Sequence, residues 1–239
     1  MGHLMLKMSL IIPCYNESKN LPLLLSKCKE INSKEKNIEI IIVDNGSTDE
    51  TSTVLDEIAS NLPFITRVKV EINQGYGHGI LAGLNVAKGE ILGWTHADMQ
   101  ADPGDVLKGL EFFQRSHKPE LLFIKGKRYG RSIVDTIFTI GMAIFETLLL
   151  RKFMWDINAQ PTMFHRKFYL NWKLPPNDFS LDLYAYYSAI KSRLEVKRFS
   201  VYFGKRAYGV SNWNISFASR YHFIKRTLQY SFDLQRRMK

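Results

Sequence analysis

The fold is decided by the stretch from Ile38 to Asp49, which reads Ile-Glu-Ile-Ile-Ile-Val-Asp-Asn-Gly-Ser-Thr-Asp. Five of its first six residues are β-branched and apolar, which is typical of a strand buried in a sheet. Ser47 and Glu50 then have the spacing of a capping box, which predicts a helix that begins just after the strand and ends near Ser60. Asp44 is therefore expected at the carboxyl end of a buried strand.

The same alternation of apolar strands and helices repeats along the first half of the chain. Further strands are predicted at Ser9 to Pro13, Ile65 to Val70, Glu90 to Thr95 and Leu121 to Ile124, and further helices at Leu21 to Ile31, at Ile80 to Ala87 and after Asp102-Pro103. Such alternation predicts an α/β fold with a mostly parallel central sheet and helices on both faces. Ligands of such sheets bind beyond the carboxyl ends of the strands.

The size of the chain favours one domain. It has 239 residues, of which 45% are hydrophobic, and this is enough to bury a substantial core. We find no repeat, low-complexity tract or clear linker. A single domain is therefore expected across residues 1–239, with one half at about residues 8–125 and a second half at about residues 126–239.

The charge is strongly basic and uneven. Lys and Arg number 33 against 23 Asp and Glu, which gives a net charge of +10. The C-terminal part, residues 204–239, holds eight of these basic residues and one acid, Asp233. Such a tail suits an anionic membrane surface or nucleic acid, but no nucleic-acid recognition motif accompanies it. We expect basic, amphipathic C-terminal helices at a membrane surface and no nucleic-acid partner.

The cysteines and apolar segments indicate the compartment. Two cysteines, Cys14 and Cys28, are too few for a disulfide framework, so we expect reduced thiols. No signal peptide fits the N-terminal residues, because their apolar stretch ends at Pro13. The predicted location is cytoplasmic, peripheral at the inner face of the membrane.

One longer apolar run, Ile133 to Leu150, predicts a helix. Asp135 and Glu146 interrupt it, so we do not expect it to cross a membrane. These acids are separated by about three helical turns, and Thr139 and Met142 lie near the same line. The helix is therefore predicted to be amphipathic, with one polar stripe.

Polar side chains follow three of the predicted strands. Tyr15 and its neighbours follow the first, where an aromatic ring could meet a nucleobase, and Asp44 follows the second, where it could accept a hydrogen bond from a base N–H. If the backbone stays extended past the fourth strand, His96, Asp98 and Gln100 project to one side. Such a set suits Mg²⁺ or Mn²⁺ whose shell a diphosphate completes, although ordinary polar surface is the alternative.

In this order, the segments resemble the GT-A glycosyltransferases of family 2, above all the dolichyl- or polyprenyl-phosphate sugar transferases. The family's Pro-x-Tyr-Asn-Glu is matched by residues 13–17 and its Asp-x-Gly-Ser-x-Asp by residues 44–49. Asn73 to Gly89 matches a stretch that lines the donor site. Gly126-Lys127-Arg128 and Arg206 to Ser211 resemble the family's Gly-Ser-Arg and Arg-x-x-Gly-x-Ser, so the similarity spans most of the chain.

The resemblance implies a GT-A fold and a set of site residues. Donor binding would fall to Pro13, Tyr15, Asn16, Glu17, Asp44, Asn73, Gly75, Ala97 and Asp98. A divalent cation, Mg²⁺ or Mn²⁺, would be held by Asp98 with His96 and Gln100. One departure stands out, because His96 replaces the first acid of the family's Asp-x-Asp and removes a negative charge.

The resemblance also implies an inverting hexosyltransferase that uses a UDP- or GDP-linked sugar. A polyprenyl phosphate acceptor needs no base, and Arg128, Arg131 and Arg206 are the candidates to bind its phosphate. Transfer to a saccharide hydroxyl, as in surface-polysaccharide synthesis, would need a base, and Asp178 or Asp182 is the candidate. Asp182 could equally have a structural role. The first half of the chain would then bind the nucleotide sugar and the second half the acceptor.

Other classes fit less well. A nucleotidyltransferase would carry a Gly-rich, basic loop after the first strand, and a dinucleotide-binding fold would carry Gly-x-Gly-x-x-Gly there. Neither pattern is present at residues 13–17. A non-catalytic membrane-surface module on the same fold remains an alternative, with His96 as its sign of lost activity.

Overall fold

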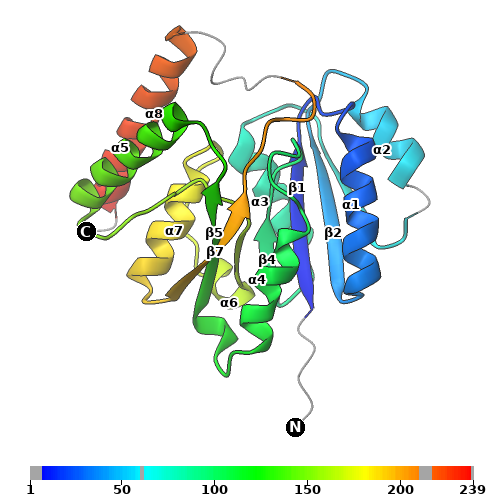
Figure 1. The fold of residues 1–239 in the computed structure, drawn as a ribbon, viewed down its shortest axis with the longest axis horizontal. Coiled ribbons are helices and arrows are strands. Elements are labelled where there is room, and N and C mark those ends of the chain that lie inside the picture. Colours follow the sequence, from blue (N-terminus) through cyan, green and yellow to red (C-terminus); the bar gives the residue numbers. More distant parts are fainter. Residues whose placement is uncertain (1–6, 60–61, 210–216, 238–239) are drawn as a thin grey trace.

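The computed structural model describes residues 7–59, 62–209 and 217–237 (Figure 1). Its strands are β1 (Met8–Cys14), β2 (Ile38–Asn45), β3 (Ile65–Val70), β4 (Ile91–Trp94), β5 (Leu122–Tyr129), β6 (Thr162–His165) and β7 (Glu195–Tyr202). Its α-helices are α1 (Leu21–Lys34), α2 (Thr51–Ala59), α3 (Tyr76–Val86), α4 (Asp105–Gln114), α5 (Ile133–Leu150), α6 (Arg166–Tyr169), α7 (Leu181–Lys191) and α8 (Phe217–Arg237), with a 3-10 turn, η1 (Pro119–Leu121), before β5.

The strands form one sheet in the order β3-β2-β1-β4-β6-β5-β7. β6 runs antiparallel to both of its neighbours, β4 and β5, and the other pairs are parallel. The predicted α/β fold with a mostly parallel sheet is thus confirmed. Cys14 is paired with Asp44 at the ends of β1 and β2, so the polar residues that follow these strands emerge at one edge of the sheet.

Helices cover both faces of the sheet, as alternation along β1 requires. Leu10 and Ile12 point into a core that they share with α1, α2 and α4, whereas Ile11 points to the other face, where α3 and α7 pack. Both faces of the strand are therefore apolar, which is why its sequence reads as a continuous hydrophobic run rather than as an alternating pattern.

Two predicted helix starts are wrong. α2 begins at Thr51, because the Ser47 hydroxyl accepts a hydrogen bond from the Asn16 amide and Asp49 Oδ1 accepts the one from the Thr51 amide. Ser47 therefore joins two loops instead of capping the helix. α3 begins four residues before the predicted Ile80, although its first turns are rich in glycine.

The early start of α3 has a packing reason. A Cβ at Gly77 would lie 2.6 Å from the carbonyl oxygen of Pro176, and the Gly77 neighbour His78 donates its amide to the Asn177 carbonyl at 2.8 Å. The helix can approach this loop closely because it carries no side chain there. Tertiary contact thus overrides the low helix propensity of glycine.

The second half of the chain is more regular than predicted. β6, α6, α7 and β7 were not expected, whereas α5 has the predicted bounds. β6 occupies the middle of the sheet between β4 and β5 although it follows α5 in sequence. A four-residue strand of this kind gives little periodic signal, and its place is set by its partners.

α5 and α8 pack against each other at one side of the molecule, away from the layers that cover the sheet (Figure 1). By length and composition α5 is able to cross a membrane, and 17% of its residues are buried. A core helix of a soluble protein that passes the same test is mostly buried. We expected from the two acids that this helix does not cross a membrane, but its composition does not exclude that. A position of the protein at the membrane surface stays a prediction.

Candidate active site

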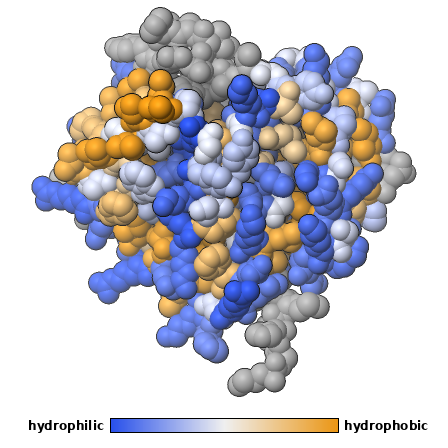
Figure 2. Space-filling view, in the orientation of Figure 1, coloured by the Kyte–Doolittle hydropathy of each residue, from blue (hydrophilic) through white to orange (hydrophobic). Residues whose placement is uncertain are grey.

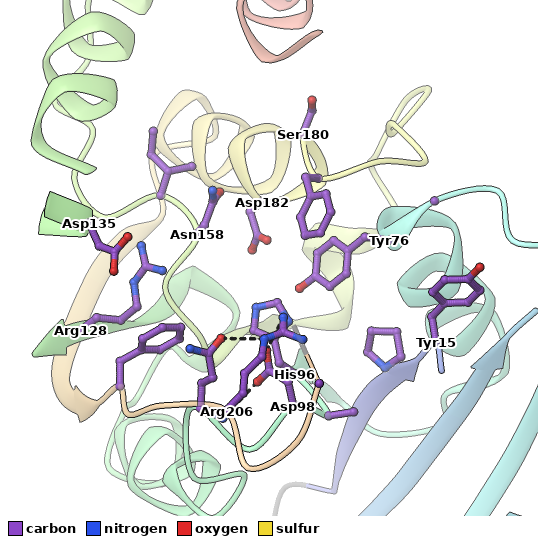
Figure 3. A pocket seen from close by; sticks show the side chains of 18 of the residues that line it. Tyr15, Tyr76, His96, Asp98, Arg128, Asp135, Asn158, Ser180, Asp182 and Arg206 are labelled. Carbon is purple, nitrogen blue, oxygen red and sulfur yellow. Dashed lines mark hydrogen bonds and ion pairs between the residues drawn. The ribbon is translucent and has the colours of Figure 1, made fainter. Parts of the chain in front are cut away.

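A cavity of about 860 Å³ lies beyond the carboxyl ends of β1 and β4 and extends to α5 and α8. Its lining contains nearly all of the residues singled out from the sequence: Pro13, Tyr15, Asn16, Glu17, Asn73, Gly75, His96, Ala97, Asp98, Gln100, Arg128, Arg131, Asp182 and Arg206. Figure 3 shows four charged members of this set, Asp98, Arg128, Asp182 and Arg206, which come from different elements of the fold. The exception is Asp44, which does not line the cavity.

The loop after β1 is bonded to the loop after β2. Asn16, whose φ is 56°, accepts the Thr48 amide proton on Oδ1 at 2.8 Å. Asp44 is buried at 4% exposure and accepts the Ser47 amide proton at 3.0 Å. Asp44 therefore fixes the loop after β2 from a buried position outside the cavity lining. A direct contact between Asp44 and a base stays a prediction.

Glu17 lies at the edge of the cavity, next to the start of α1. Its carboxylate accepts a hydrogen bond from the Asn20 amide group, and its Oε1 is 4.0 Å from Nη1 of Arg206. Burial raises the pKa of Glu17, and the bond from Asn20 works against that rise. The carboxylate is thus held in place by a neighbouring side chain.

Asn45 and Asn73 line the cavity beside Gly75. Asn45 Nδ2 donates to the Gly75 carbonyl at 3.0 Å, and Asn73 Oδ1 accepts the Gly75 amide proton at 2.8 Å. Gly75 has a φ of 115°, which is accessible to glycine and disfavoured for other residues. The two amides therefore fix a sharp turn at the entrance to α3.

The segment after β4 does not stay extended, so the condition under which the three side chains project to one side is not met. β4 ends at Trp94, and Met99 has a φ of 59°. The turn lets Asp98 Oδ1 accept the amide proton of Gln100 at 3.1 Å. His96, Asp98 and Gln100 all line the cavity nevertheless, because the turn returns Gln100 to it.

His96 is held by an aromatic stack. Its ring lies 5.3 Å from the ring of Tyr76, which in turn stacks on Phe179 at 4.7 Å. Burial lowers the pKa of His96 and raises that of the Tyr76 hydroxyl. The neutral imidazole is therefore favoured, in a position fixed by its neighbours.

Asp98 is paired with an arginine from a distant part of the chain. Arg206 follows β7, and its Nη2 lies 2.9 Å from Oδ2 of Asp98 (Figure 3). Its Nε donates to Oε1 of Gln100 at 3.3 Å. The side chain of Asp98 is almost fully buried, so this ion pair is shielded from water on the side of Asp98.

The other two arginines come from the end of β5, which holds Arg128, and from the turn between β5 and α5, which holds Arg131. Arg128 forms a two-nitrogen ion pair with the buried Asp156, with Nε 2.8 Å from Oδ1. Burial alone would raise the pKa of Asp156, but Arg128 lowers it. Arg131 donates to the hydroxyl of Thr139 at 2.6 Å, so its charge is not offset by an acid in this way.

Asp182, at the start of α7, belongs to a buried polar network. Its Oδ1 accepts from Gln160 Nε2 at 2.9 Å and lies 3.5 Å from Nζ of Lys125. Lys125 is fully buried and also donates to the Thr162 hydroxyl at 2.7 Å. Burial lowers the pKa of Lys125 to about 8, so its charge is sustained by Asp182 rather than by water.

The polar stripe of α5 faces the cavity. Asp135, Thr139, Met142 and Glu146 all line it, at the spacing that the sequence predicts for one face of the helix. Glu146 is fully buried and accepts a hydrogen bond from Ser231 of α8, while its Oε2 is buried and has no hydrogen-bond partner among the described side chains. Burial raises the pKa of Glu146 to about 7.

The residues near Asp98 fit a divalent cation that is shared with a ligand, and they do not form a complete protein site. Among residues 7–59, 62–209 and 217–237, no group of three or more His, Cys, Asp or Glu side chains could hold a metal ion. One carboxylate, one imidazole and one amide are present, and Mg²⁺ or Mn²⁺ in such sites takes further oxygens from phosphates. His96, Asp98 and Gln100 as metal ligands stay a prediction.

Several residues of the site carried no usable signal in the sequence. No sequence pattern marked Tyr76, Phe179, Lys125 or Asp156 as a residue of the site. Their roles arise from pairs far apart in the chain, such as Lys125 with Asp182. For α5, by contrast, the spacing of Asp135 and Glu146 was informative, although we assigned the stripe only to a polar face.

Comparison with known proteins gives a family. The model of "Glycosyl transferase family 2" matches residues 9–184. An undecaprenyl-phosphate 4-deoxy-4-formamido-L-arabinose transferase of Proteus mirabilis is 36% identical over 106 residues, which are 42% of this chain and 31% of that protein. Its counterpart from Yersinia enterocolitica is 31% identical over 134 residues, 50% of this chain and 40% of that protein. The matched stretch thus spans about a third of the length of these relatives.

Solved structures share the fold at low sequence identity. Glucosyl-3-phosphoglycerate synthase from Mycobacterium tuberculosis, in complex with Mn²⁺, UDP-glucose and phosphoglyceric acid, matches with a TM-score of 0.73 and 14% identity, over 96% of this chain and 80% of that one. A mannosyltransferase from Pyrobaculum calidifontis, in complex with GDP-mannose and Mn²⁺, matches with a TM-score of 0.64 and 17% identity, over 98% and 74%. The arrangement of the sheet is therefore GT-A-like, and with the match over residues 9–184 the chain belongs to glycosyl transferase family 2.

Proposed function

We propose that this protein transfers a sugar, with inversion, from a nucleoside-diphosphate sugar to a polyprenyl phosphate at the cytoplasmic face of a membrane. One observation carries the proposal: a single continuous cavity joins the strand-end motifs to three arginines. The residues that meet there are Tyr15, Glu17, Asp98, Arg128, Arg131 and Arg206. Such a cavity offers an aromatic surface, acids for a metal-bound diphosphate, and cations for a second phosphate.

The nucleotide would bind at the strand ends. Tyr15 is 37% exposed, so a base can cover its ring, and Asn16, Asn73 and Gly75 line the adjoining wall. Asp44 would support this pocket through its bond to the Ser47 amide, since it does not reach the cavity itself. UDP- and GDP-linked sugars both fit these groups, and Pro13 and Ala97 add apolar lining.

Asp98 would hold the divalent cation, with His96 and Gln100 beside it. When bound, Mg²⁺ or Mn²⁺ would supply Lewis-acid stabilisation of the charge that develops on the departing nucleoside diphosphate. The protein's own contribution is to fix Asp98 through the Gln100 amide and to keep the His96 ring stacked on Tyr76. A fixed donor set of this kind keeps its geometry during the reaction.

The acceptor is an anion, which decides what the protein has to do. An oxygen of the lipid phosphate attacks the anomeric carbon while the bond from that carbon to the diphosphate oxygen breaks, and the electron pair leaves with the nucleoside diphosphate. A phosphate monoester is already ionised near neutral pH, so no side chain has to remove a proton. Arg131 donates to the Thr139 hydroxyl, whereas Arg128 is bonded to Asp156, so Arg131 is the residue best placed to bind this phosphate.

The names of the relatives support a lipid acceptor. The curated relatives are undecaprenyl-phosphate transferases, although they match over only part of their length. The outer face of α5 adds a physical reason: Ile133, Val134, Ile137, Ile144 and Leu148 are between 55% and 79% exposed. Figure 2 shows these apolar side chains gathered over α5, at the left of the view. We propose that this face rests in the membrane interface while the polar stripe lines the cavity.

A transfer assay tests the proposal. Purified protein is incubated with radiolabelled UDP- or GDP-sugars, Mn²⁺ and undecaprenyl phosphate, and the product is extracted into organic solvent. We expect lipid-soluble label that requires both the acceptor and the metal. If label stays in the aqueous phase with every nucleotide sugar, the polyprenyl phosphate acceptor is wrong.

Transfer to a saccharide hydroxyl is the second candidate, because Asp182 lines the same cavity. A hydroxyl acceptor requires a base, and Asp182 is an acid within reach of a ligand there. Its position 3.5 Å from the Lys125 ammonium weakens this candidate, since a neighbouring cation lowers the proton affinity of a carboxylate. Soluble glycan acceptors in the same assay decide between the two.

A further inference from the structure

Arg206 occupies a site made of three acceptors at the centre of the cavity. Its Nη2 lies 2.9 Å from Asp98 Oδ2, its Nε donates to Gln100 Oε1 at 3.3 Å, and its Nη1 lies 4.0 Å from Glu17 Oε1. Each nitrogen of the guanidinium thus faces a different acceptor. Asp98 has its other oxygen bonded to the Gln100 amide, so Oδ2 is the oxygen that Arg206 takes.

The backbone places Arg206 there. The Gly204 amide donates to the Gln100 carbonyl at 2.7 Å, and Gln100 Nε2 donates back to the Gly204 carbonyl at 3.1 Å. Asn20 Nδ2 donates to the Tyr208 carbonyl at 3.3 Å. The segment on either side of Arg206 is therefore tied to the turn after β4 and to the start of α1.

The charges make this contact significant. His96 stands where the family pattern has the first acid of Asp-x-Asp, and it is stacked on Tyr76, so Asp98 is the carboxylate on which a cation at this turn depends. A guanidinium and a divalent cation cannot both neutralise Oδ2 of Asp98, because they repel each other at short range and compete for one lone-pair direction. Binding of one requires the other to move.

We propose that Arg206 is the counter-ion of Asp98 in the donor-free protein and that a divalent cation binds only by displacing it. This inference rests on the proposed function, in which a nucleoside diphosphate and a metal bind together. The displaced guanidinium is then the cation available to the phosphates of donor or acceptor. Metal and diphosphate therefore help each other to bind: the metal releases Arg206, and the diphosphate gives the released arginine a new partner.

The reason for such an exchange follows from burial. Asp98 is 5% exposed, and a buried carboxylate without a counter-ion is costly. Arg206 supplies that counter-ion before the donor arrives, and its own side chain is 26% exposed, so it has room to turn outward. The single remaining acid then suffices, because the site is never left with an unpaired charge.

Metal binding without any sugar tests the exchange. Mn²⁺ binding to wild-type protein is measured by the loss of the free-ion paramagnetic resonance signal, alone and with UDP or GDP. In wild-type protein we expect weak binding of Mn²⁺ alone and binding at least about tenfold tighter with one of the nucleotides. Arg206→Gln should bind Mn²⁺ alone about tenfold more tightly than wild type. The factor by which UDP or GDP increases its Mn²⁺ affinity should be smaller than in wild type.

Matched variants make the result specific. Lys205→Gln removes the same charge one residue away, from an exposed side chain, and should leave Mn²⁺ binding at the wild-type value. The double variant Asp98→Asn/Arg206→Gln should lose the tighter Mn²⁺ binding that is expected for Arg206→Gln alone. Arg206→Lys keeps a cation on the same segment and should bind Mn²⁺ less tightly than Arg206→Gln, which separates competition from a change in the loop.

The outcomes are distinct from those of the transfer assay. If Arg206→Gln binds Mn²⁺ no more tightly than wild type, or if no protein binds Mn²⁺ under any of these conditions, the exchange is overturned. Sugar transfer to the lipid is measured separately and can succeed in either case. If Mn²⁺ binding behaves as expected while no label reaches the lipid, the exchange stands and the acceptor of the proposed function is wrong.

Discussion

The two regions that meet at the cavity differ in how their residues are held. At the strand ends of a rigid sheet, Asn16 bonds the loop after β1 to the loop after β2, and Asp44 holds the second of these loops through the Ser47 amide. On the opposite side, α5 and α8 pack mainly on each other, and much of the apolar surface of α5 is exposed. The first region has a fixed geometry, which suits a nucleotide. The second offers a surface, which suits a lipid-linked substrate at a membrane.

The largest effect is expected at the strand ends. Asp98→Asn removes the charge that a divalent cation needs, while it keeps the shape and the bond from the Gln100 amide. We expect kcat/KM for transfer to fall by about a hundred- to a thousandfold. Asp102→Asn is the matched control, because Asp102 follows in the same loop but is exposed and lies outside the cavity lining. Equal activity of the two variants would remove Asp98 from the chemistry.

The buried pair of Lys125 and Asp182 lies between the two regions, and breaking it is expected to have a large effect on stability. Lys125→Met leaves Asp182 as a buried carboxylate without its cation, and removing one partner of such a pair costs about 3 kcal/mol or more. The double variant Lys125→Met/Asp182→Asn should recover much of the lost free energy of unfolding, because it removes the unpaired charge. Urea unfolding of the wild type and of these variants, including Asp182→Asn alone, completes the cycle. Simple additivity of the two single losses would show that the pair is not coupled.

The strand-end region could be predicted from the sequence, and the comparison explains why. Apolar runs followed by polar clusters mark buried parallel strands and their carboxyl ends, so residues such as Tyr15 and Asp98 could be placed near one another before any coordinates. Asp44 also lies at this edge, as predicted, but its carboxylate accepts the Ser47 amide proton and does not line the cavity. Strand position is a periodic property, but the direction of one carboxylate is decided by its local bonds.

The second half of the chain was harder to predict because its contacts join distant segments. Arg206 meets Asp98 across more than a hundred residues of sequence, and β6 enters the sheet between strands that precede it. No local pattern encodes such pairs. α5 is the instructive exception, since an 18-residue amphipathic helix has a strong period and its predicted bounds are confirmed.

The contact between α5 and α8, where Glu146 is buried, is expected to make a smaller contribution to the free energy of unfolding, and this contribution depends on pH. Burial raises the pKa of Glu146 to about 7 from 4.5. The folded protein therefore binds this proton more tightly than the unfolded chain, and the free energy of unfolding should fall as pH rises from about 4.5 through about 7. The shift corresponds to about 3 kcal/mol at most. Above that range the contribution should be constant.

Glu146→Gln tests this joint, because glutamine keeps an oxygen for the Ser231 hydroxyl and does not ionise. Melting temperatures are measured at pH 5 and pH 8. The fall between these two values should be smaller in the variant than in wild type, and the variant should be the more stable protein at pH 8. Glu120→Gln is the control, because it makes the same change at an acid that, unlike Glu146, does not line the cavity. If both variants follow the wild-type pH dependence, Glu146 does not titrate in this range.

The smallest effect is expected on the outer face of α5, because a membrane interface buries each side chain only in part. Ile137 and Leu148 are 64% and 74% exposed, and neither lines the cavity. The variant Ile137→Asn/Leu148→Asn should bind vesicles that contain phosphatidylglycerol about three- to tenfold more weakly, as expected for the loss of roughly 1 kcal/mol of apolar burial. Leu170→Asn changes a side chain of similar exposure at the end of α6 and should bind as wild type does. If all three proteins sediment equally with vesicles, the outer face of α5 is not the surface that meets the membrane, and the cavity must receive its acceptor from another direction.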